Sequence, residues 1–457
     1  MKIKNVLVTL KYFKGELNPF DASALEAALM LEGVSITVLA MAPLSVKDSL
    51  KALTRLGVKA VLISDGIYAG SDTIATSLVL SEAIKRLNPD CVFCGRQSVD
   101  GDTAQVPPML AQRLNYGLIS NVIKLNNDQL VLRNGESKEW QNNTVYTLEK
   151  SYNLRFPSIF SKASEVEVID NSILNIPLSK CGLNGSTTRV VNTYESSVGR
   201  RFCKFIDAKD LSRVIYESLN KTKVKPQDTA ADKLDEIHYV GNVKKVADGV
   251  AKNSYQINVD GKSAAEVASY ILDNNIKNVL WEDGAALKVL AARVAVILNA
   301  GLCADCISFS VKDGGLVMTR PAQGGSVTAD IISTGSVAMA TVRTANEKCS
   351  DIIFSVGKGA VSYVEKIKEF AQKFGAEICC SRAVADGGVL PYPAQVGLTG
   401  KTVCPKVYVA FGISGAVQHT CAISGAGTVI AVNVDKNARI YDYADYGVKG
   451  DIKDVEL

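Results

Sequence analysis

Short apolar runs alternate with longer amphipathic segments in the N-terminal part of the chain, and this alternation constrains the fold more than any other feature of the sequence. The β-rich runs predict strands, and the segments with helical periodicity predict helices. In chain order the predicted elements are strand 5–10, helix 21–32 with Asp21 as its N-cap, strand 34–41, helix 45–56, strand 60–63, helix 71–87 and strand 91–94. Strands that alternate with helices form a doubly wound parallel sheet, and such sheets bind ligands outside the carboxyl ends of their strands.

Composition narrows the class of protein. A chain of 457 residues with 47% hydrophobic and 21% charged residues is typical of an α/β protein of several domains. The net charge is only +4, and no basic stripe is present, which argues against a nucleic-acid partner. The apolar run near the N-terminus is too short for a signal peptide, and no run is long enough to span a bilayer. We therefore expect a cytoplasmic protein with no membrane partner.

The cysteines allow two interpretations. Cys91 with Cys94, and Cys303 with Cys306, have the CxxC spacing of a metal or iron–sulfur site. The alternative is small apolar residues in buried segments. Strand alternation sends Cys91 and Cys94 to opposite faces, which favours the second interpretation. The chain has only two histidines, so a histidine-rich metal site is excluded, and we expect no metal.

A polar loop follows the strand at 91–94. It runs GRQSVDGDTAQV over residues 95–106 and opens a predicted helix. Free N–H groups at that helix start would suit a phosphate, whereas an ordinary capped loop is the alternative. The candidate nucleotide-binding residues are Asp100, Thr103, Ala104, Gln105 and Val106. Thr103 and Gln105 would donate side-chain hydrogen bonds, and Asp100 or Asp102 would hold a ribose or cap the helix.

A second candidate nucleotide site lies in residues 381–451. Residues 406–411 predict a buried strand, the GISG turn at 412–415 ends it, and residues 416–421 predict a helix. A strand, a glycine turn and a helix start bring backbone N–H groups and a positive dipole end together.

The motifs QVGLTG, GISGAVQH and ADYG follow one another in this stretch. Together they resemble the flavin domain at the C-terminal end of the α subunit of electron transfer flavoproteins, and the resemblance implies a bound FAD. Ser381 and Arg382 match the pair beside the flavin, where a guanidinium favours the reduced, anionic ring. Thr399 matches the hydroxyl near flavin N5, and His419 the donor at the pyrimidine end. The other implied cofactor-binding residues are Gln395, Val396, Gly397, Gly400, Gly412, Ser414, Gly415, Gln418, Asn433 and Asp445.

Two departures from the family pattern affect the flavin site. Leu398 stands where the family usually has glutamine, so one polar contact is missing. Lys358, between Gly357 and Gly359, replaces an arginine and loses its bidentate fork. We expect flavin binding to survive both changes.

The N-terminal part resembles the β subunit of the same family, through the run NPFD at 18–21 and the loop at 95–106. In that subunit the loop binds AMP, and in the electron-bifurcating branch, with a DGDTAQV-like run, it binds a second FAD. Here Pro107-Pro108 replaces the usual Gly-Pro. The segment 11–18 is shorter than in the family, so we expect the family's hairpin there to be missing. The family's basic docking run is also absent after Phe156-Pro157-Ser158.

From His238 onward the chain resembles the α subunit, through AGLCAD at 300–305 and RPAQGG at 320–325. Little sequence precedes the flavin domain, so this first α-type domain should be reduced. We predict a β-like nucleotide-binding domain at 1–190, an arm and linker at 191–236, a reduced α-like α/β domain at 237–345 and a Rossmann-like FAD domain at 346–457. Residues 221–232 and 343–349 would be the linker and hinge that let the flavin domain swing.

The resemblance implies a fused, single-chain electron transfer flavoprotein. It would carry electrons on FAD to or from a flavoenzyme of the acyl-CoA dehydrogenase type. If the N-terminal site holds FAD, the protein would also oxidise NADH by electron bifurcation, with ferredoxin or flavodoxin as an acceptor, and would be an enzyme in its own right. The alternative is a nucleotide-binding sensor or structural protein with this fold and no redox role.

Overall fold

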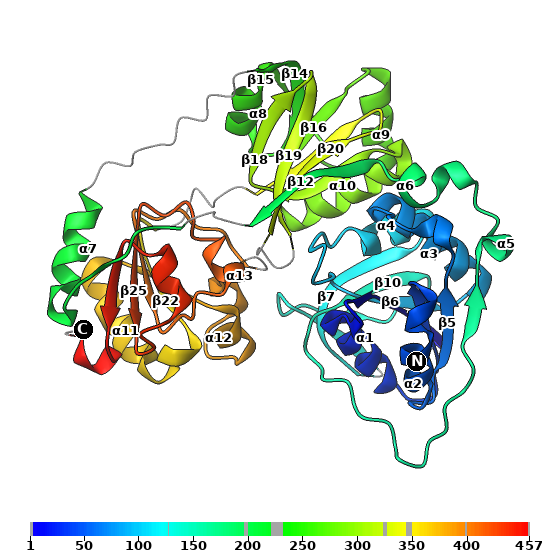
Figure 1. The fold of residues 1–457 in the computed structure, drawn as a ribbon, viewed down its shortest axis with the longest axis horizontal. Helices are drawn as coiled ribbons and strands as arrows, with labels where there is room; N and C mark the ends of the chain where they lie inside the picture. The colour runs from blue at the N-terminus through cyan, green and yellow to red at the C-terminus, as the bar shows by residue number, and fades with distance from the viewer. Residues whose placement is uncertain are drawn as a thin grey trace. The chain divides into compact units, whose positions relative to one another are not determined.

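The structure is a computed structural model that describes all residues except 1–2, 127, 196–199, 221–231, 323–326, 344–349, 398–399 and 456–457. The chain divides into two compact units (Figure 1). Unit 1 comprises residues 1–193, 230–323 and 329–342, and unit 2 comprises residues 194–229, 324–328 and 343–457. The predicted linker and hinge lie largely outside the described residues.

The first part of unit 1 is a doubly wound sheet, as the sequence predicts. The sheet order is β11-β5-β4-β1-β6-β10-β7-β8-β9, and the first seven strands run parallel. The strands are β1 Asn5–Leu10, β4 Ser35–Met41, β5 Lys59–Ile63, β6 Cys91–Gly95, β7 Gly117–Leu125, β8 Gln129–Leu132, β9 Ser137–Glu139, β10 Thr144–Leu148 and β11 Glu167–Ile169. The helices are α1 Pro19–Leu29, α2 Lys47–Thr54, α3 Thr73–Leu87 and α4 Val106–Leu114.

Helices cover both faces of this sheet. Residues of α1 and α2 pack with Cys91 and Phe93 on one face. Residues of α3 and α4 pack with Val92 and Cys94 on the other face. Cys91 and Cys94 therefore lie on opposite faces, as strand alternation predicts. The described residues contain no group of three or more His, Cys, Asp or Glu side chains that could hold a metal ion.

Two local predictions for this part are wrong. Helix α1 begins at Pro19 after Asn18, because proline suits the first helical turn, so Asp21 is not the N-cap. The expected loss of the hairpin at 11–18 is also wrong, since β2 Tyr12–Phe13 pairs antiparallel with β3 Glu16–Leu17. Lys14 and Gly15 both have positive φ, as a tight hairpin turn of two residues requires.

The α-like part of unit 1 contains a five-stranded parallel sheet in the order β15-β14-β16-β21-β17 and a four-stranded sheet in the order β12-β20-β19-β18. The strands are β12 Thr188–Glu195, β14 Leu234–Val240, β15 Ala251–Gln256, β16 Asn278–Glu282, β17 Gly301–Cys306, β18 Ser308–Lys312, β19 Gly315–Ala322, β20 Val327–Ser333 and β21 Ala338–Val342. The helices are α8 Lys244–Val250, α9 Ala264–Asp273 and α10 Ala285–Leu298, and the short helices α5 Asn171–Leu174 and α6 Gly182–Gly185 precede β12.

Unit 2 is built on a six-stranded parallel sheet in the order β13-β26-β25-β24-β22-β23. The strands are β13 Lys204–Phe205, β22 Ile352–Val356, β23 Glu377–Cys380, β24 Val407–Phe411, β25 Thr428–Asn433 and β26 Tyr446–Lys449. Helices α7 Leu211–Leu219, α11 Val364–Phe374 and α12 Arg382–Asp386 contribute to the core on one face. The predicted helix at 416–421 is the single turn α13 Val417–Thr420. No helix in the described part of the chain is both long enough and apolar enough to cross a membrane.

Candidate nucleotide sites

The strand order of unit 2 reverses between β22 and β24, the position where doubly wound sheets bind ligands. From β22 the chain moves to β23 on one side and then to β24 on the other, so the strand order reverses at this point. Gly357 and Gly412 follow the two strands, and a Cβ on Gly357 would lie 2.2 Å from the Gly412 carbonyl oxygen. Gly415 has a φ of +86°, and a Cβ there would lie 2.1 Å from the Ile440 nitrogen. Glycine is therefore required for these turns to meet backbone to backbone at the carboxyl edge of the sheet.

The loop at 395–401 closes on itself beside β23. The Lys401 N–H donates to the Gln395 carbonyl at 2.9 Å, and the Val396 N–H donates to the Cys380 carbonyl at 2.8 Å. A Cβ on Gly400 would lie 2.2 Å from the Gln395 carbonyl oxygen. Thr399 and Leu398 lie outside the described residues, so the predicted contact to flavin N5 stays a prediction.

His419 is buried in this unit, and its ring has one partner. Its Nε2 lies 2.8 Å from the hydroxyl of buried Tyr408. Burial raises the pKa of Tyr408 well above its ordinary value, so the phenol keeps its proton. Burial lowers the pKa of His419 to about 4, and the Val396 backbone opposes this more weakly. The ring is therefore neutral, and its Nδ1 has no hydrogen-bond partner of normal geometry among the described residues.

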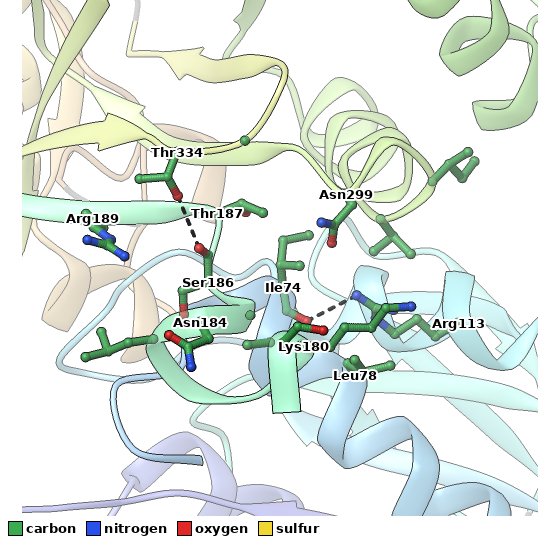
Figure 2. A pocket seen from close by; sticks show the side chains of 17 residues that line it. Ile74, Leu78, Arg113, Lys180, Asn184, Ser186, Thr187, Arg189, Asn299 and Thr334 are labelled. Carbon is green, nitrogen blue, oxygen red and sulfur yellow. Dashed lines mark hydrogen bonds between the residues drawn. The ribbon is translucent and has the colours of Figure 1, made fainter. Parts of the chain in front are cut away.

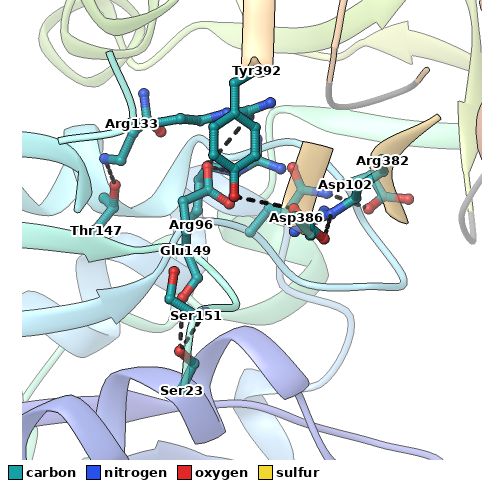
Figure 3. A network of polar contacts seen from close by, with 12 residues as sticks. Ser23, Arg96, Asp102, Arg133, Thr147, Glu149, Ser151, Arg382, Asp386 and Tyr392 are labelled. Carbon is teal, nitrogen blue, oxygen red and sulfur yellow. Dashed lines mark hydrogen bonds and ion pairs between the residues drawn. The ribbon is translucent and has the colours of Figure 1, made fainter. Parts of the chain in front are cut away.

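Arg382 begins α12 and is already paired with a carboxylate. Its Nε donates to Asp386 Oδ2 at 3.1 Å, and the Tyr392 hydroxyl donates to Asp386 Oδ1 at 3.2 Å (Figure 3). Ser381 donates its N–H to the Val356 carbonyl at 2.9 Å, which holds the start of α12 at the end of β22. Part of the Arg382 charge is therefore offset within its own helix.

The other predicted residues of unit 2 fall into two groups. Ser414 and Gln418 are exposed beside the glycine turn. The side chains of Asn433 and Asp445 make hydrogen bonds to the backbone of unit 2. Asn433 Nδ2 donates to the Ile413 carbonyl at 2.8 Å, and Asp445 Oδ2 accepts from the Val429 N–H at 2.8 Å. Asp445 also pairs with Arg201, a residue that the sequence analysis missed, and Arg201 Nη2 donates to the Ala426 carbonyl at 2.6 Å.

A cavity of about 440 Å³ lies in unit 1. It sits at the carboxyl ends of β1 and β6, where the strand order of the nine-stranded sheet reverses. Four of the five predicted residues of the 95–106 loop line it, namely Thr103, Ala104, Gln105 and Val106. Asp100 is instead paired with Lys11, with 2.8 Å between Nζ and Oδ2. Burial works to raise the pKa of Asp100, but the hydrogen bond and charge of Lys11 outweigh it, so the pKa lies below its ordinary value.

Helix α4 offers this cavity few free donors. Val106 is its first residue, and Pro107 and Pro108 follow without N–H groups. Gln105 is buried, and both ends of its side-chain amide already have partners. Its Oε1 accepts from the Thr73 hydroxyl at 2.8 Å, and its Nε2 donates to the Leu302 carbonyl at 3.1 Å. A phosphate would therefore depend on the loop backbone and Lys11 more than on the helix dipole.

Two further lining residues were not identified as site residues from the sequence. Asn18 is buried, and its Oδ1 has no hydrogen-bond partner in the described part of the chain. Asp21 accepts hydrogen bonds from the N–H groups of Lys11 and Gly95, at 2.8 and 3.1 Å, and burial raises its pKa to about 7. The run NPFD at 18–21 was the available signal, since a buried acid and amide so early in a helix are unusual.

These features define an α/β protein with candidate ligand sites at the carboxyl edges of two doubly wound sheets. The residues present fit a flavin nucleotide in unit 2, since the buried Nδ1 of His419 has no hydrogen-bond partner of normal geometry among the described residues and glycine turns meet at the edge of the sheet.

Comparisons with known proteins identify the family to which the chain belongs. The family model "Electron transfer flavoprotein domain" matches residues 6–143 and 251–369, more than half of the chain. The model "Electron transfer flavoprotein FAD-binding domain" matches residues 348–424. The chain therefore belongs to the electron transfer flavoprotein family, and its C-terminal part is the FAD-binding domain.

Relatives of both subunit types are similar to this chain. It is 30% identical to "Electron transfer flavoprotein subunit alpha" of Bacillus subtilis over 48% of this chain and 79% of that protein. It is 33% identical to "Electron transfer flavoprotein subunit beta" of Thermoanaerobacterium thermosaccharolyticum over 46% of this chain and 87% of that protein. It is 36% identical to "Protein FixA" of Azorhizobium caulinodans over 42% of this chain and 77% of that protein. The chain thus combines α-type and β-type parts.

Proposed function

We propose that this protein is an electron carrier, which holds FAD in unit 2 and exchanges electrons with a flavoenzyme of the acyl-CoA dehydrogenase type. The observation that carries the proposal is the coincidence of the FAD-binding family match with the glycine turns and buried His419 at one sheet edge. The bound flavin would supply the redox chemistry. The protein's own contribution is to bind it, to orient it and to present the neutral imidazole of His419.

The cavity of unit 1 would hold a second nucleotide through an adenosine monophosphate group, which AMP and FAD share. Unpartnered Asn18 Oδ1 offers an acceptor for an adenine amino group or a ribose hydroxyl, and Lys11 offers a charge for the phosphate. The DGDTAQV run supports FAD, whereas the paired prolines of α4 and the modest volume support AMP. With FAD there, NADH would serve as donor and ferredoxin or flavodoxin as one acceptor.

An exposed apolar loop would dock the partner flavoenzyme in place of a basic run. Phe156, Ile159 and Phe160 are 95%, 84% and 87% exposed. The loop is held firmly, because Arg55 donates to the carbonyls of Ser158 and Ser161 at 3.0 and 3.2 Å. Exposed apolar side chains on a fixed loop are typical of a protein-binding site.

The test is electron transfer between the reduced protein and an acyl-CoA dehydrogenase, followed anaerobically by flavin absorbance. We expect transfer at a rate that falls at least about tenfold in a Phe156→Ala/Phe160→Ala double variant, as loss of apolar anchors implies. Leu178→Ala, which changes another exposed apolar residue, is the control and should leave the rate unchanged. A protein that binds FAD but exchanges no electrons would support the nucleotide-binding sensor instead.

A further inference from the structure

Unit 1 contains a second pocket, of about 610 Å³, that shares no lining residue with the nucleotide cavity. Helix α3 separates the two sites, because Thr73 and Thr76 line the nucleotide cavity whereas Ile74 and Leu78 line this pocket. The segment 179–189, the end of α10 and the turn at 334–335 supply the other walls (Figure 2).

The pocket is basic. Arg113, Lys180 and Arg189 line it, and none of its described lining residues is acidic. The carboxylate of Asp72 supports one wall, where its Oδ2 accepts from the N–H groups of Thr187 and Thr188 at 2.8 and 3.0 Å. The charges of Glu82 and Asp72 act on Arg113, but neither residue lines the pocket.

Arg113 is the least exposed of the three cations. It is partly buried, its Nε donates to Ser77 Oγ at 3.0 Å and its Nη2 donates to the Ile74 carbonyl at 3.1 Å. Both acceptors are neutral, and burial lowers the pKa of Arg113, although the charges of Glu82 and Asp72 oppose this. An anion in the pocket would give this partly buried guanidinium a direct counter-charge.

The remaining walls define the rest of the ligand. Ile74, Leu78, Leu183, Val296 and Ile297 give an apolar surface, and Asn184 and Asn299 add side-chain amides. The cations come from two walls, with Arg113 on α4 and Lys180 and Arg189 on the 179–189 segment (Figure 2). An anion with more than one charged group matches this arrangement better.

We propose that this pocket binds a small metabolite with two or more phosphate groups, with its charges on Arg113, Lys180 and Arg189 and its apolar part against α3 and α10. The site would be separate from both nucleotide sites. A ligand there would stabilise the β-like and α-like parts of unit 1 together, because it binds only the folded arrangement.

The test uses inorganic pyrophosphate, titrated calorimetrically into the full-length protein with excess AMP present to fill the nucleotide cavity. We expect saturable binding that survives moderate salt and raises the melting temperature. Lys180→Gln and Arg189→Gln change exposed residues that make no ion pair in the described chain, so the fold should persist. Each should weaken binding about tenfold, as loss of one charged hydrogen bond implies.

Two comparisons decide the outcome. Lys138→Gln removes an exposed lysine of unit 1 far from this pocket's lining and should leave binding unchanged. Arg113→Lys keeps the charge but loses the fork, so it should weaken binding without abolishing it. Absence of saturation, or equal weakening by Lys138→Gln and Arg189→Gln, would overturn the proposal.

Discussion

The two candidate nucleotide sites lie at the same position of a doubly wound sheet, but different groups border them. The site in unit 1 is bordered by charged and amide side chains, namely Lys11, Asp21 and Asn18, beside a helix whose second and third residues are proline. The site in unit 2 is bordered by backbone, where Gly357, Gly412 and Gly415 let turns meet closely. In both units the strand order sets the position of the candidate site. The local sequence determines whether backbone groups or side chains border that site.

The largest expected effect comes from Gly415→Ala. The added Cβ would meet the Ile440 nitrogen and force a positive φ on alanine, which should destabilise unit 2 by more than about 2 kcal/mol and abolish FAD binding. Nucleotide in unit 1 should remain. Flavin content and hydrogen exchange of unit 2 peptides measure both effects.

Gly375→Ala is the matched control. Gly375 also has a positive φ, +62°, but nothing lies within 4 Å of its added Cβ. It should cost about 1 kcal/mol, from backbone conformation alone, and leave FAD bound. Equal flavin loss in both variants would show that the close approach at Gly415 has no special role.

The second prediction concerns His419 and acid. Its folded pKa of about 4 lies below the ordinary value of 6.5, so the unfolded chain gains the proton first as the pH falls. Unit 2 should lose stability between pH about 6.5 and about 4, by up to about 3 kcal/mol. His419→Gln should flatten this dependence in thermal unfolding, and Tyr408→Phe should retain it. An unchanged profile in His419→Gln would contradict a buried neutral imidazole.

The third prediction concerns Asp21 in unit 1, whose effect on stability has the opposite pH dependence to that of His419. Asp21 has a folded pKa of about 7, above the ordinary value of 3.8, so its burial costs little in acid and more as the pH rises towards 7. Between pH 5 and 8, unit 1 should lose about 2 kcal/mol relative to Asp21→Asn. Stability that rises with pH in unit 2 and falls with pH in unit 1 would support the comparison of the two sites. Trends of the same sign in both units would contradict it.

The smallest effect is expected at Arg382. Removing its charge should lower the flavin reduction potential, but by less than about 30 mV, because Asp386 already offsets it. Asp386→Asn should raise the potential by a similar amount. Spectroscopic redox titration of the two variants measures both shifts, and shifts of the same sign would contradict the proposed position of the flavin.

The sequence predicted the features that depend on local pattern. The strand at 5–10 has its predicted limits, strands β6 and β24 lie within a residue of theirs, and the loop at 95–106 lies at a cavity. The errors involve contacts between distant residues. Asp21 has the sequence pattern of a helix N-cap, but its carboxylate accepts a hydrogen bond from the N–H of Gly95, 74 residues away. The Arg201–Asp445 pair joins residues 244 apart, and nothing local indicates such a pairing.

The short turns show a second limit. Residues 416–421 have a helical pattern, yet α13 spans Val417–Thr420 only, so the dipole argument for phosphate binding loses most of its force. The short length of segment 11–18 predicts no hairpin, yet two residues with positive φ, Lys14 and Gly15, suffice to close one.

The most direct test of the two-site account is the amount of nucleotide released per chain when the purified protein is denatured. We predict one FAD from unit 2 and a second nucleotide, FAD or AMP, from unit 1. In Gly415→Ala, the first should disappear and the second should remain. FAD alone in the wild-type protein would contradict the site in unit 1, and release of no FAD at all would contradict the account as a whole.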